Sequence, residues 1–214
     1  MSHAPGPRLR TTCGALAALA LIAGALGAGR ESAQELGPRA LRQRMKEMAE
    51  PGPHHRALEP LLGRFRFRAY FRLTLDDNPE SAHGVAESRW ILDGRFLEQE
   101  LRGRRLTRSF EGRLVLGFDN YQQTYVGTWL DEYDPGITTL TGPPSADGRT
   151  MAFEVLGNDP RFAGQPPFAN KRRRRGELVI ESENRHVLRF FERPATGGDE
   201  ITMAEITFER VAER

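Results

Sequence analysis

The sequence predicts a mainly β protein, an antiparallel up-and-down β-barrel of about ten strands preceded by one or two short helices. Three observations lead to this fold class. Residues 65–75 alternate apolar and polar side chains, which is typical of a half-buried strand. Asp93-Gly94 lies between two further strand patterns and favours a type I′ turn, because both residues tolerate positive φ. The remaining strand patterns follow one another through short turns, as in a meander.

Helices are expected only before the barrel. Pro38 suits a first helical position, and Leu41 and Met45 recur at helical spacing. The prolines at 51 and 53 should end this helix. A second short helix is expected over residues 54–62.

The strands should then form one sheet. A sandwich would fit the same pattern, but a closed barrel is favoured because it leaves no edge strand. The Pro- and Gly-rich segment 157–170 is expected to be a lid or a mobile loop. Strands are expected over residues 65–75, 84–92, 95–101, 113–118, 124–130, 137–141, 150–155, 175–181, 187–191 and 201–209.

Residues 1–28 have the layout of a secretory signal peptide, with a basic start, an apolar core and small residues at the exit. Cleavage after Ala25 or Ala28 would give a secreted or periplasmic protein, and an uncleaved anchor is the alternative. The apolar run is shorter than the roughly 20 strongly apolar residues of a membrane span. We therefore expect a helical arm or linker at 29–53 and a barrel domain at 54–214, with no stable membrane span after cleavage.

Charge and motifs exclude several classes of function. Lys and Arg number 31 and Asp and Glu 29, and the excess lies in residues 1–28, so the mature chain is neutral and gives no argument for a nucleic-acid partner. Cys13 is the only cysteine and lies in the same segment, which leaves no disulfide or thiol nucleophile. No nucleophile-elbow, zinc-protease or nucleotide-binding motif is present, so neither a cofactor nor a metal is expected. The oligomeric state stays open.

Histidines and acids leave two chemical alternatives. His186 opens an expected strand and could reach a barrel mouth as a haem or metal ligand, although a surface position is the commoner case. His54 and His55 should face different ways on a helix. Glu98 and Glu100 share one strand face; if that face is inward they form an acid/base pair, and if outward, the preferred interpretation, they are solvated.

Aromatic residues in the expected strands could either fill the barrel or line a site for one small ligand. The candidate ligand-binding residues are Trp90, Phe96, Tyr125, Trp129 and Asp131. Asp131 is included because strand ends lie at barrel mouths, but it could equally cap a turn.

A basic run could bind phosphate, lipopolysaccharide or another polyanion. It leads into a strand, however, so alternate side chains would point to opposite faces, and neighbouring glutamates could neutralise it. A solvated or paired stretch is therefore the preferred interpretation. The run consists of Lys171, Arg172, Arg173, Arg174 and Arg175.

Four segments are similar, in order, to one protein family. They are GPHHRALEPLLGRF (52–65), RWILDGRFLEQE (89–100), GFDNYQQTYVGTWLDEY (117–133) and ITFER (206–210). They resemble the exported bacterial family called domain of unknown function DUF 1579. The resemblance implies a lipocalin-type (calycin-like) barrel and no particular reaction. The chain departs from the family in Phe65, where Trp is more usual, and in the basic character of 157–175.

Three functional hypotheses follow. The leading one is an exported, non-catalytic, lipocalin-like barrel that binds a small apolar molecule. The first alternative is a barrel enzyme that uses Glu98 or Glu100 as an interior acid or base. The second is an envelope interaction protein that uses the arm at 30–53 and the basic run at 171–175.

Overall fold

The structure is a computed structural model, and it describes residues 36–72, 74–159, 163–164, 171–194 and 197–212. The chain divides into two compact units, Met1–Gln43 and Arg44–Arg214. The expected signal peptide at 1–28 lies outside the described residues. None of the helices in the described ranges is long and apolar enough to cross a membrane.

Helix α1 (Pro38–Ala49) begins at the proline that the sequence marks as a helix start. No residue of α1 is buried, and Leu41 and Met45 are exposed. Its last turn belongs to the second unit, where the carbonyl oxygen of Met48 accepts a hydrogen bond of 2.8 Å from the side-chain amide of Asn120. Apolar packing therefore contributes little to holding this helix.

Two short helical turns replace the single helix expected over residues 54–62. Helix α2 (Pro53–Arg56) is followed by the 3-10 helix η1 (Glu59–Leu61). Pro60 has no N–H group to continue an α-helical ladder, and Leu61 N instead donates to Leu58 O at 2.9 Å. Leu58 and Leu61 are both buried in the core of the barrel.

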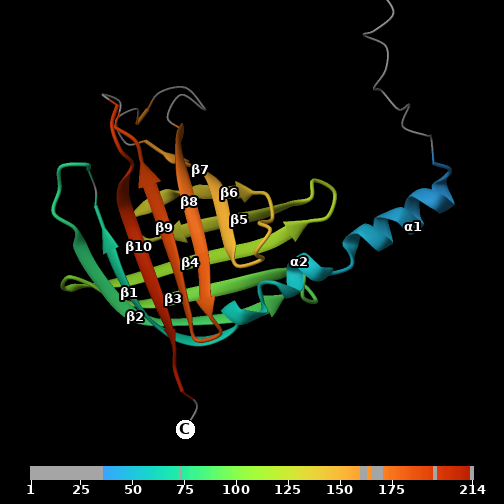
Figure 1. The fold of residues 1–214 in the computed structure, drawn as a ribbon, viewed down its shortest axis with the longest axis horizontal. Helices are drawn as coiled ribbons and strands as arrows, with labels where there is room; N and C mark the ends of the chain where they lie inside the picture. Colours follow the sequence, from blue (N-terminus) through green and yellow to red (C-terminus); the bar gives the residue numbers. More distant parts are fainter. Residues whose placement is uncertain (1–35, 73, 160–162, 165–170, 195–196, 213–214) are drawn as a thin grey trace, which may run out of the picture. The chain divides into compact units, whose positions relative to one another are not determined.

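Ten antiparallel strands form one closed barrel in up-and-down order, as the sequence predicts (Figure 1). Each strand pairs with its neighbours in the chain, and β1 pairs with β10 to close the sheet. Closure leaves no edge strand in the barrel. The strands are β1 (Gly63–Phe71), β2 (Glu80–Ile91), β3 (Phe96–Arg105), β4 (Arg108–Asp119), β5 (Thr124–Asp131), β6 (Asp134–Gly142), β7 (Thr150–Asn158), β8 (Lys171–Ser182), β9 (Arg185–Glu192) and β10 (Ile201–Arg210).

The two ends of the barrel differ. We call the end at which β1 begins the capped end, because α2 and η1 lead into β1 there and Leu58 and Leu61, from this segment, join the core. We call the opposite end the loop end. Because the strands are antiparallel neighbours, every odd-numbered strand runs from the capped end to the loop end.

Side chains alternate along the strands between the core and the outer surface. On β1, Phe65, Phe67 and Ala69 are buried, whereas the arginines between them are exposed. The inward side chains of the ten strands join in one core. A residue two positions along a strand from a core residue therefore faces inward as well.

The hairpin turns partly follow the expected chemistry. Asp93 and Gly94 both have positive φ, 55° and 82°, as a type I′ turn requires, but Leu92 has positive φ as well, and the loop between paired residues spans 92–95. After β4 the left-handed residue is Gln123, with φ of 53°.

Asp119 contributes to that turn through its side chain. Its Oδ1 accepts the backbone N–H groups of Tyr121 and Gln122, at 2.8 and 3.1 Å. These bonds hold the pKa of Asp119 below its ordinary value.

Two segments near the loop end differ from expectation. β1 ends at Phe71 and not at residue 75, because Asp77 accepts the N–H of Thr74 at 2.8 Å and draws the chain into a turn. The expected loop at 157–170 is shorter, since β7 continues to Asn158 and β8 begins at Lys171. Most of what lies between these strands is outside the described residues.

Candidate functional site

Trp129 and Asp131 lie together on the inner face of β5, at the loop end. The indole Nε1 of Trp129 donates to Oδ2 of Asp131 at 2.8 Å, and the side chain of Trp129 is 7% exposed. Oδ1 of Asp131 accepts the N–H groups of Tyr133 and Asp134, at 2.8 and 3.1 Å. Asp131 therefore caps the turn and also orients the indole, so both of its oxygens have partners.

The other three aromatic candidates do not join them. Tyr125 faces inward near the capped end, where its hydroxyl donates to the carbonyl oxygen of His54 at 3.1 Å, and burial raises its pKa. Trp90 packs on the core in the same half of the barrel. Phe96 lies on the outer face of β3, paired with Gly117, so the expectation that it lines the interior is wrong.

An aromatic cluster surrounds Trp129 at the loop end. The ring of Phe190 on β9 lies 6.4 Å from that of Trp129 at 64°. A β-carbon on Gly112 would lie 3.2 Å from Trp129 and 3.4 Å from Phe110, so both rings cover that glycine. Phe110 in turn lies 5.9 Å from Phe71. We use aromatic cluster for Phe71, Phe110, Trp129, Tyr133 and Phe190.

Arg105 is buried beside this cluster, although sequence reasoning did not identify it. Its side chain is 7% exposed, and its Nε donates to Oε2 of Glu80 at 2.9 Å. The guanidinium carbon lies 4.2 Å from the ring centre of Tyr133 and 5.3 Å from that of Phe71. The signal was available: the inward alternation of Leu97, Gln99 and Leu101 continues to Arg105, but the strand was expected to end at residue 101.

A second buried charge lies at the same end. Glu192, the last residue of β9, is 4% exposed and forms an ion pair with Arg172 and a contact of 3.3 Å with Arg174 Nε. Arg172 also lies 4.0 Å from the buried carboxylate of Asp159. These inward arginines are therefore partnered by acids inside the barrel.

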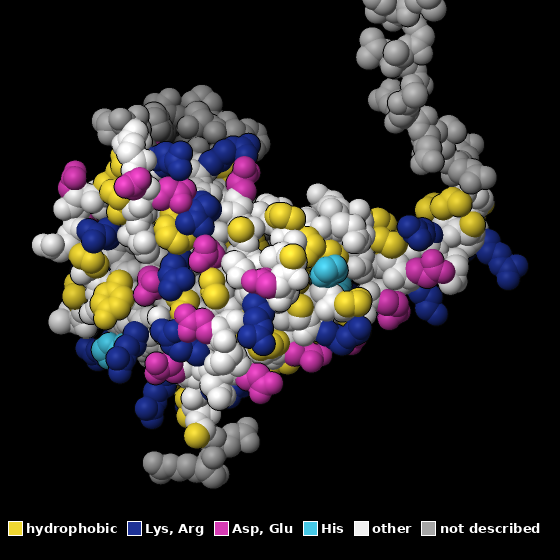
Figure 2. Space-filling view, in the orientation of Figure 1, with side chains coloured by type: hydrophobic (Ala, Val, Ile, Leu, Met, Phe, Trp, Pro, Cys, Tyr) yellow, Lys and Arg dark blue, Asp and Glu magenta, His cyan; other side chains and the backbone are white. Residues whose placement is uncertain are grey.

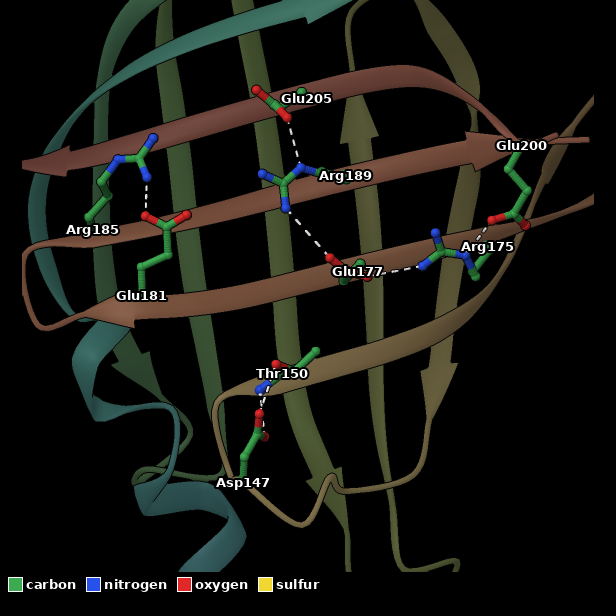
Figure 3. Close-up of polar contacts among 9 residues, drawn as sticks. All are labelled: Asp147, Thr150, Arg175, Glu177, Glu181, Arg185, Arg189, Glu200 and Glu205. Carbon is green, nitrogen blue, oxygen red and sulfur yellow. Dashed lines mark hydrogen bonds and ion pairs between the residues drawn. The ribbon is translucent and has the colours of Figure 1, made fainter.

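The basic run does not form one cationic patch, in line with the expected alternation along β8. Arg173 and Arg175 point outward, where Arg173 pairs with Glu154. Arg175 lies between Glu177 and Glu200, at 3.1 and 2.8 Å (Figure 3). The side chain of Lys171 is outside the described set.

Ion pairs continue across the outer surface of β8, β9 and β10. Arg189 bridges Glu205 at 2.7 Å and Glu177 at 3.5 Å, which extends the row that begins at Arg175 (Figure 3). In the space-filling view, basic and acidic side chains are interspersed over this face (Figure 2). Such a surface offers a polyanion little unpaired positive charge.

Glu98 and Glu100 also face outward, on β3. Arg89 pairs with Glu98, and Arg113 lies 3.5 Å from Glu98 and 2.8 Å from Glu100. The two carboxylates are thus members of an external ion-pair network. The hypothesis of an interior acid/base pair is wrong, because the closed sheet turns the opposite face of β3 inward.

His186 lies inside the barrel at the capped end, and the expected positions at a mouth or on the surface are both wrong. It is 2% exposed and stacks on Phe208 with ring centres 4.4 Å apart. Its Nε2 lies 3.3 Å from Gln99 Nε2, which also donates to Ser88 Oγ at 2.9 Å. Burial lowers the pKa of His186 to about 3, so the ring is neutral at physiological pH.

The other histidines at the capped end have separate partners. His54 lies against Phe118, with ring centres 4.3 Å apart, whereas Nδ1 of His55 accepts the N–H of Gly52 at 3.0 Å. Burial lowers the pKa of His55. Among the described residues, no group of three His, Cys, Asp or Glu side chains could hold a metal ion.

These observations define a calycin-like closed barrel with one end capped by buried leucines and, at the other, aromatic and charged side chains buried together. The family model described as "Protein of unknown function (DUF1579)" matches residues 50–210. The chain therefore belongs to the DUF1579 family, which confirms the resemblance seen in the sequence.

One of three similar solved structures supports the fold. The crystal structure of Rv2717c from M. tuberculosis is similar with a TM-score of 0.51 and 15% identity, over 76% of this chain and 100% of that one. A de novo designed fluorescence-activating β-barrel gives 0.39 and 15%, over 72% and 97%. The S-type phycobiliprotein lyase CPES from Guillardia theta gives 0.46 and 11%, over 79% and 98%. At these identities and TM-scores, only the similarity to Rv2717c is informative, and it supports the fold alone. No match was found among curated protein sequences.

Proposed function

We propose that this protein is an exported, non-catalytic barrel that binds a small, largely apolar molecule at the loop end. One observation carries the proposal: aromatic and charged side chains are buried together at this end, around Trp129, Arg105 and Glu192. Small-molecule sites have this composition, with apolar walls and a few polar groups that set orientation, and they occur at the mouths of barrels.

The energetic cost of these charges supports a role beyond stability. Removing an ion from water costs several kcal/mol, and an ion pair often only offsets that cost. The capped end avoids this desolvation cost, because the side chains of Leu58 and Leu61 bury only apolar atoms there. A barrel selected for stability alone would be more stable with apolar residues in place of Arg105 and Glu192 as well.

Binding is tested with two environment-sensitive dyes and a reporter variant. The chain has two tryptophans, so Trp90→Phe leaves Trp129 as the single indole. We expect N-phenyl-1-naphthylamine or 8-anilinonaphthalene-1-sulfonate to bind with a saturable dissociation constant and to quench Trp129. Native mass spectrometry of protein from its own host should show an added organic mass.

Matched variants localise the site. Trp129→Ala should weaken dye binding, followed by the fluorescence of the dye itself, at least tenfold, whereas Phe96→Ala, on the outer face, should leave the affinity unchanged. Unsaturable binding of both dyes together with an unliganded native mass would contradict the proposal. Equal losses in the two variants would place the site elsewhere.

Export is tested separately, by N-terminal sequencing of the mature protein. The basic start and the uncharged Ala- and Leu-rich run of residues 1–28 support cleavage after Ala25 or Ala28. A periplasmic or secreted product should begin at residue 26 or 29. A cell-associated product that retains residues 1–28 would contradict this part of the proposal.

A further inference from the structure

Arg105 has more hydrogen-bonding capacity than its surroundings use. An arginine has five N–H donors, and within the described part of the chain the guanidinium has one hydrogen-bonding partner, Glu80, which it contacts through Nε. The Nη groups have none there, although the side chain is 7% exposed. They are not fully buried, because Nδ1 of His186 is the one fully buried side-chain N or O atom without a hydrogen-bond partner in the described part of the chain. This edge of the guanidinium is therefore open to solvent and carries no acceptor from the described chain, so it can receive an acceptor from a ligand.

The guanidinium is held in a fixed orientation. Tyr133, from the turn after β5, lies 4.2 Å from its central carbon, and Phe71, from the end of β1, lies at 5.3 Å. Phe110 supports both rings, at 6.2 Å from Tyr133 and 5.9 Å from Phe71. Three separate strands or turns thus preset the position of Arg105, so a ligand would not have to order it.

We propose that the Nη edge of Arg105 is the subsite for a carboxylate, and that the ligand is a small amphipathic carboxylic acid whose apolar part contacts the aromatic cluster. The inference rests on the proposed function and names its ligand class. A carboxylate matches the fork of a guanidinium with two parallel charge-assisted hydrogen bonds. Tyr133 is 42% exposed and gives the apolar part of the ligand a surface at the rim.

The negative charge of Glu80 lowers the affinity of the Arg105 subsite for a carboxylate ligand, and this effect provides a second test. Its carboxylate neutralises Arg105 from the Nε side, and its side chain is 34% exposed. A bound carboxylate would share the guanidinium with Glu80, and the two anions would repel each other. Removal of the Glu80 charge should therefore strengthen binding of an anion and leave a neutral analogue unaffected.

The experiment compares 11-(dansylamino)undecanoate with its methyl ester on the folded full chain. The two probes share their apolar part and differ in charge. We expect the carboxylate to bind about 10- to 100-fold more tightly, as for one charge-assisted bidentate contact. Energy transfer from Trp129 in the Trp90→Phe background reports where they bind.

Three variants assign the preference to Arg105. Arg105→Gln should abolish the difference between the two probes, and Glu80→Gln should tighten the carboxylate about threefold or more without changing the ester. Arg102→Gln is the matched control, because Arg102 lies on the same strand but faces outward and pairs with Glu100 at 3.1 Å. It should leave both affinities unchanged.

The outcomes separate this inference from the proposed function. Equal binding of acid and ester to the unmodified site would overturn the carboxylate subsite and leave an apolar ligand in place. Saturable binding of neither probe nor dye would overturn both. If Arg105→Gln does not fold, the comparison in the parent protein and the Glu80→Gln variant still decide the question.

Discussion

At the scale of single residues, His186 links the stability of the barrel to pH. Its ring is enclosed by Phe65 and Phe208, and its Nδ1 is a buried atom without a hydrogen-bond partner among the described residues. The folded chain therefore resists protonation of this ring, with a pKa of about 3 against the ordinary 6.5. Between these two pH values the unfolded chain binds a proton that the folded chain does not.

The direction of the pH dependence of stability follows from this difference in proton binding between the unfolded and the folded chain. The contribution of His186 is complete above pH 6.5 and is lost as the pH falls toward 3. We expect the free energy of unfolding to drop by about 1.4 kcal/mol per pH unit in this window because of this one group. Urea denaturation between pH 7 and 4.5 measures the slope.

Two variants isolate the contribution. His186→Phe removes the titrating ring and should flatten the slope by about that amount, even if the variant is less stable at pH 7. His83→Gln changes an exposed histidine on the outer face of β2 and should keep the parent slope. Parallel curves for the parent and His186→Phe would show that the ring is not protected as the structure indicates.

At the scale of the element, β8 shows how one run of like charges is divided by a strand. Inward Arg172 and Arg174 contact the buried Glu192, and outward Arg173 and Arg175 contact exposed glutamates. Ion pairs between the same kinds of side chain therefore contribute differently to the free energy of unfolding. Exposed ion pairs contribute about 0–1 kcal/mol, whereas breaking a buried one costs about 3–5 kcal/mol.

Glu192→Gln and Glu200→Gln form a matched pair of variants on this element. The first removes the charge that faces two inward arginines, whose side chains are about one quarter exposed, and should lower the free energy of unfolding by about 2–4 kcal/mol. The second removes a partner of Arg175 at the surface and should cost less than about 1 kcal/mol. Denaturant midpoints at constant slope measure both, and a larger loss in Glu200→Gln would reverse the assignment of faces.

At the scale of the whole molecule, the barrel depends on a pairing between the two ends of its sheet. β1 pairs with β10 over Phe65–Phe71 and Ala204–Arg210, with Phe67 opposite Phe208. Without β10, both β1 and β9 would expose unpaired backbone and apolar side chains. The closing pair therefore stabilises every other hairpin in the sheet.

Two truncations test this dependence. Removal of residues 201–214 should abolish cooperative thermal unfolding and cause aggregation, because the core loses Ile206 and Phe208 together with the closing strand. Removal of residues 1–43 should change the melting temperature by no more than about 2 °C, because that segment is a separate unit. A cooperative melt of the first truncation would contradict a barrel that requires closure.

The sequence by itself determined the number of strands, their order and the meander, because these depend on local alternation and turn residues. The pattern at 65–75 located the first strand, and the Asp93-Gly94 pair located the hairpin between β2 and β3. It also determined that neighbouring arginines of residues 171–175 would face opposite ways, since the strand period is two.

Only the tertiary structure decided which face of each strand is enclosed and which end of the barrel is capped. Phe96, Glu98 and Glu100 share one face of β3, and local sequence does not tell whether that face meets the core or the arginines of β2 and β4. Closure of the sheet settles this, and it encloses Arg105 and His186. The reason is physical: alternation is a local property, whereas burial depends on partners that are distant in the chain.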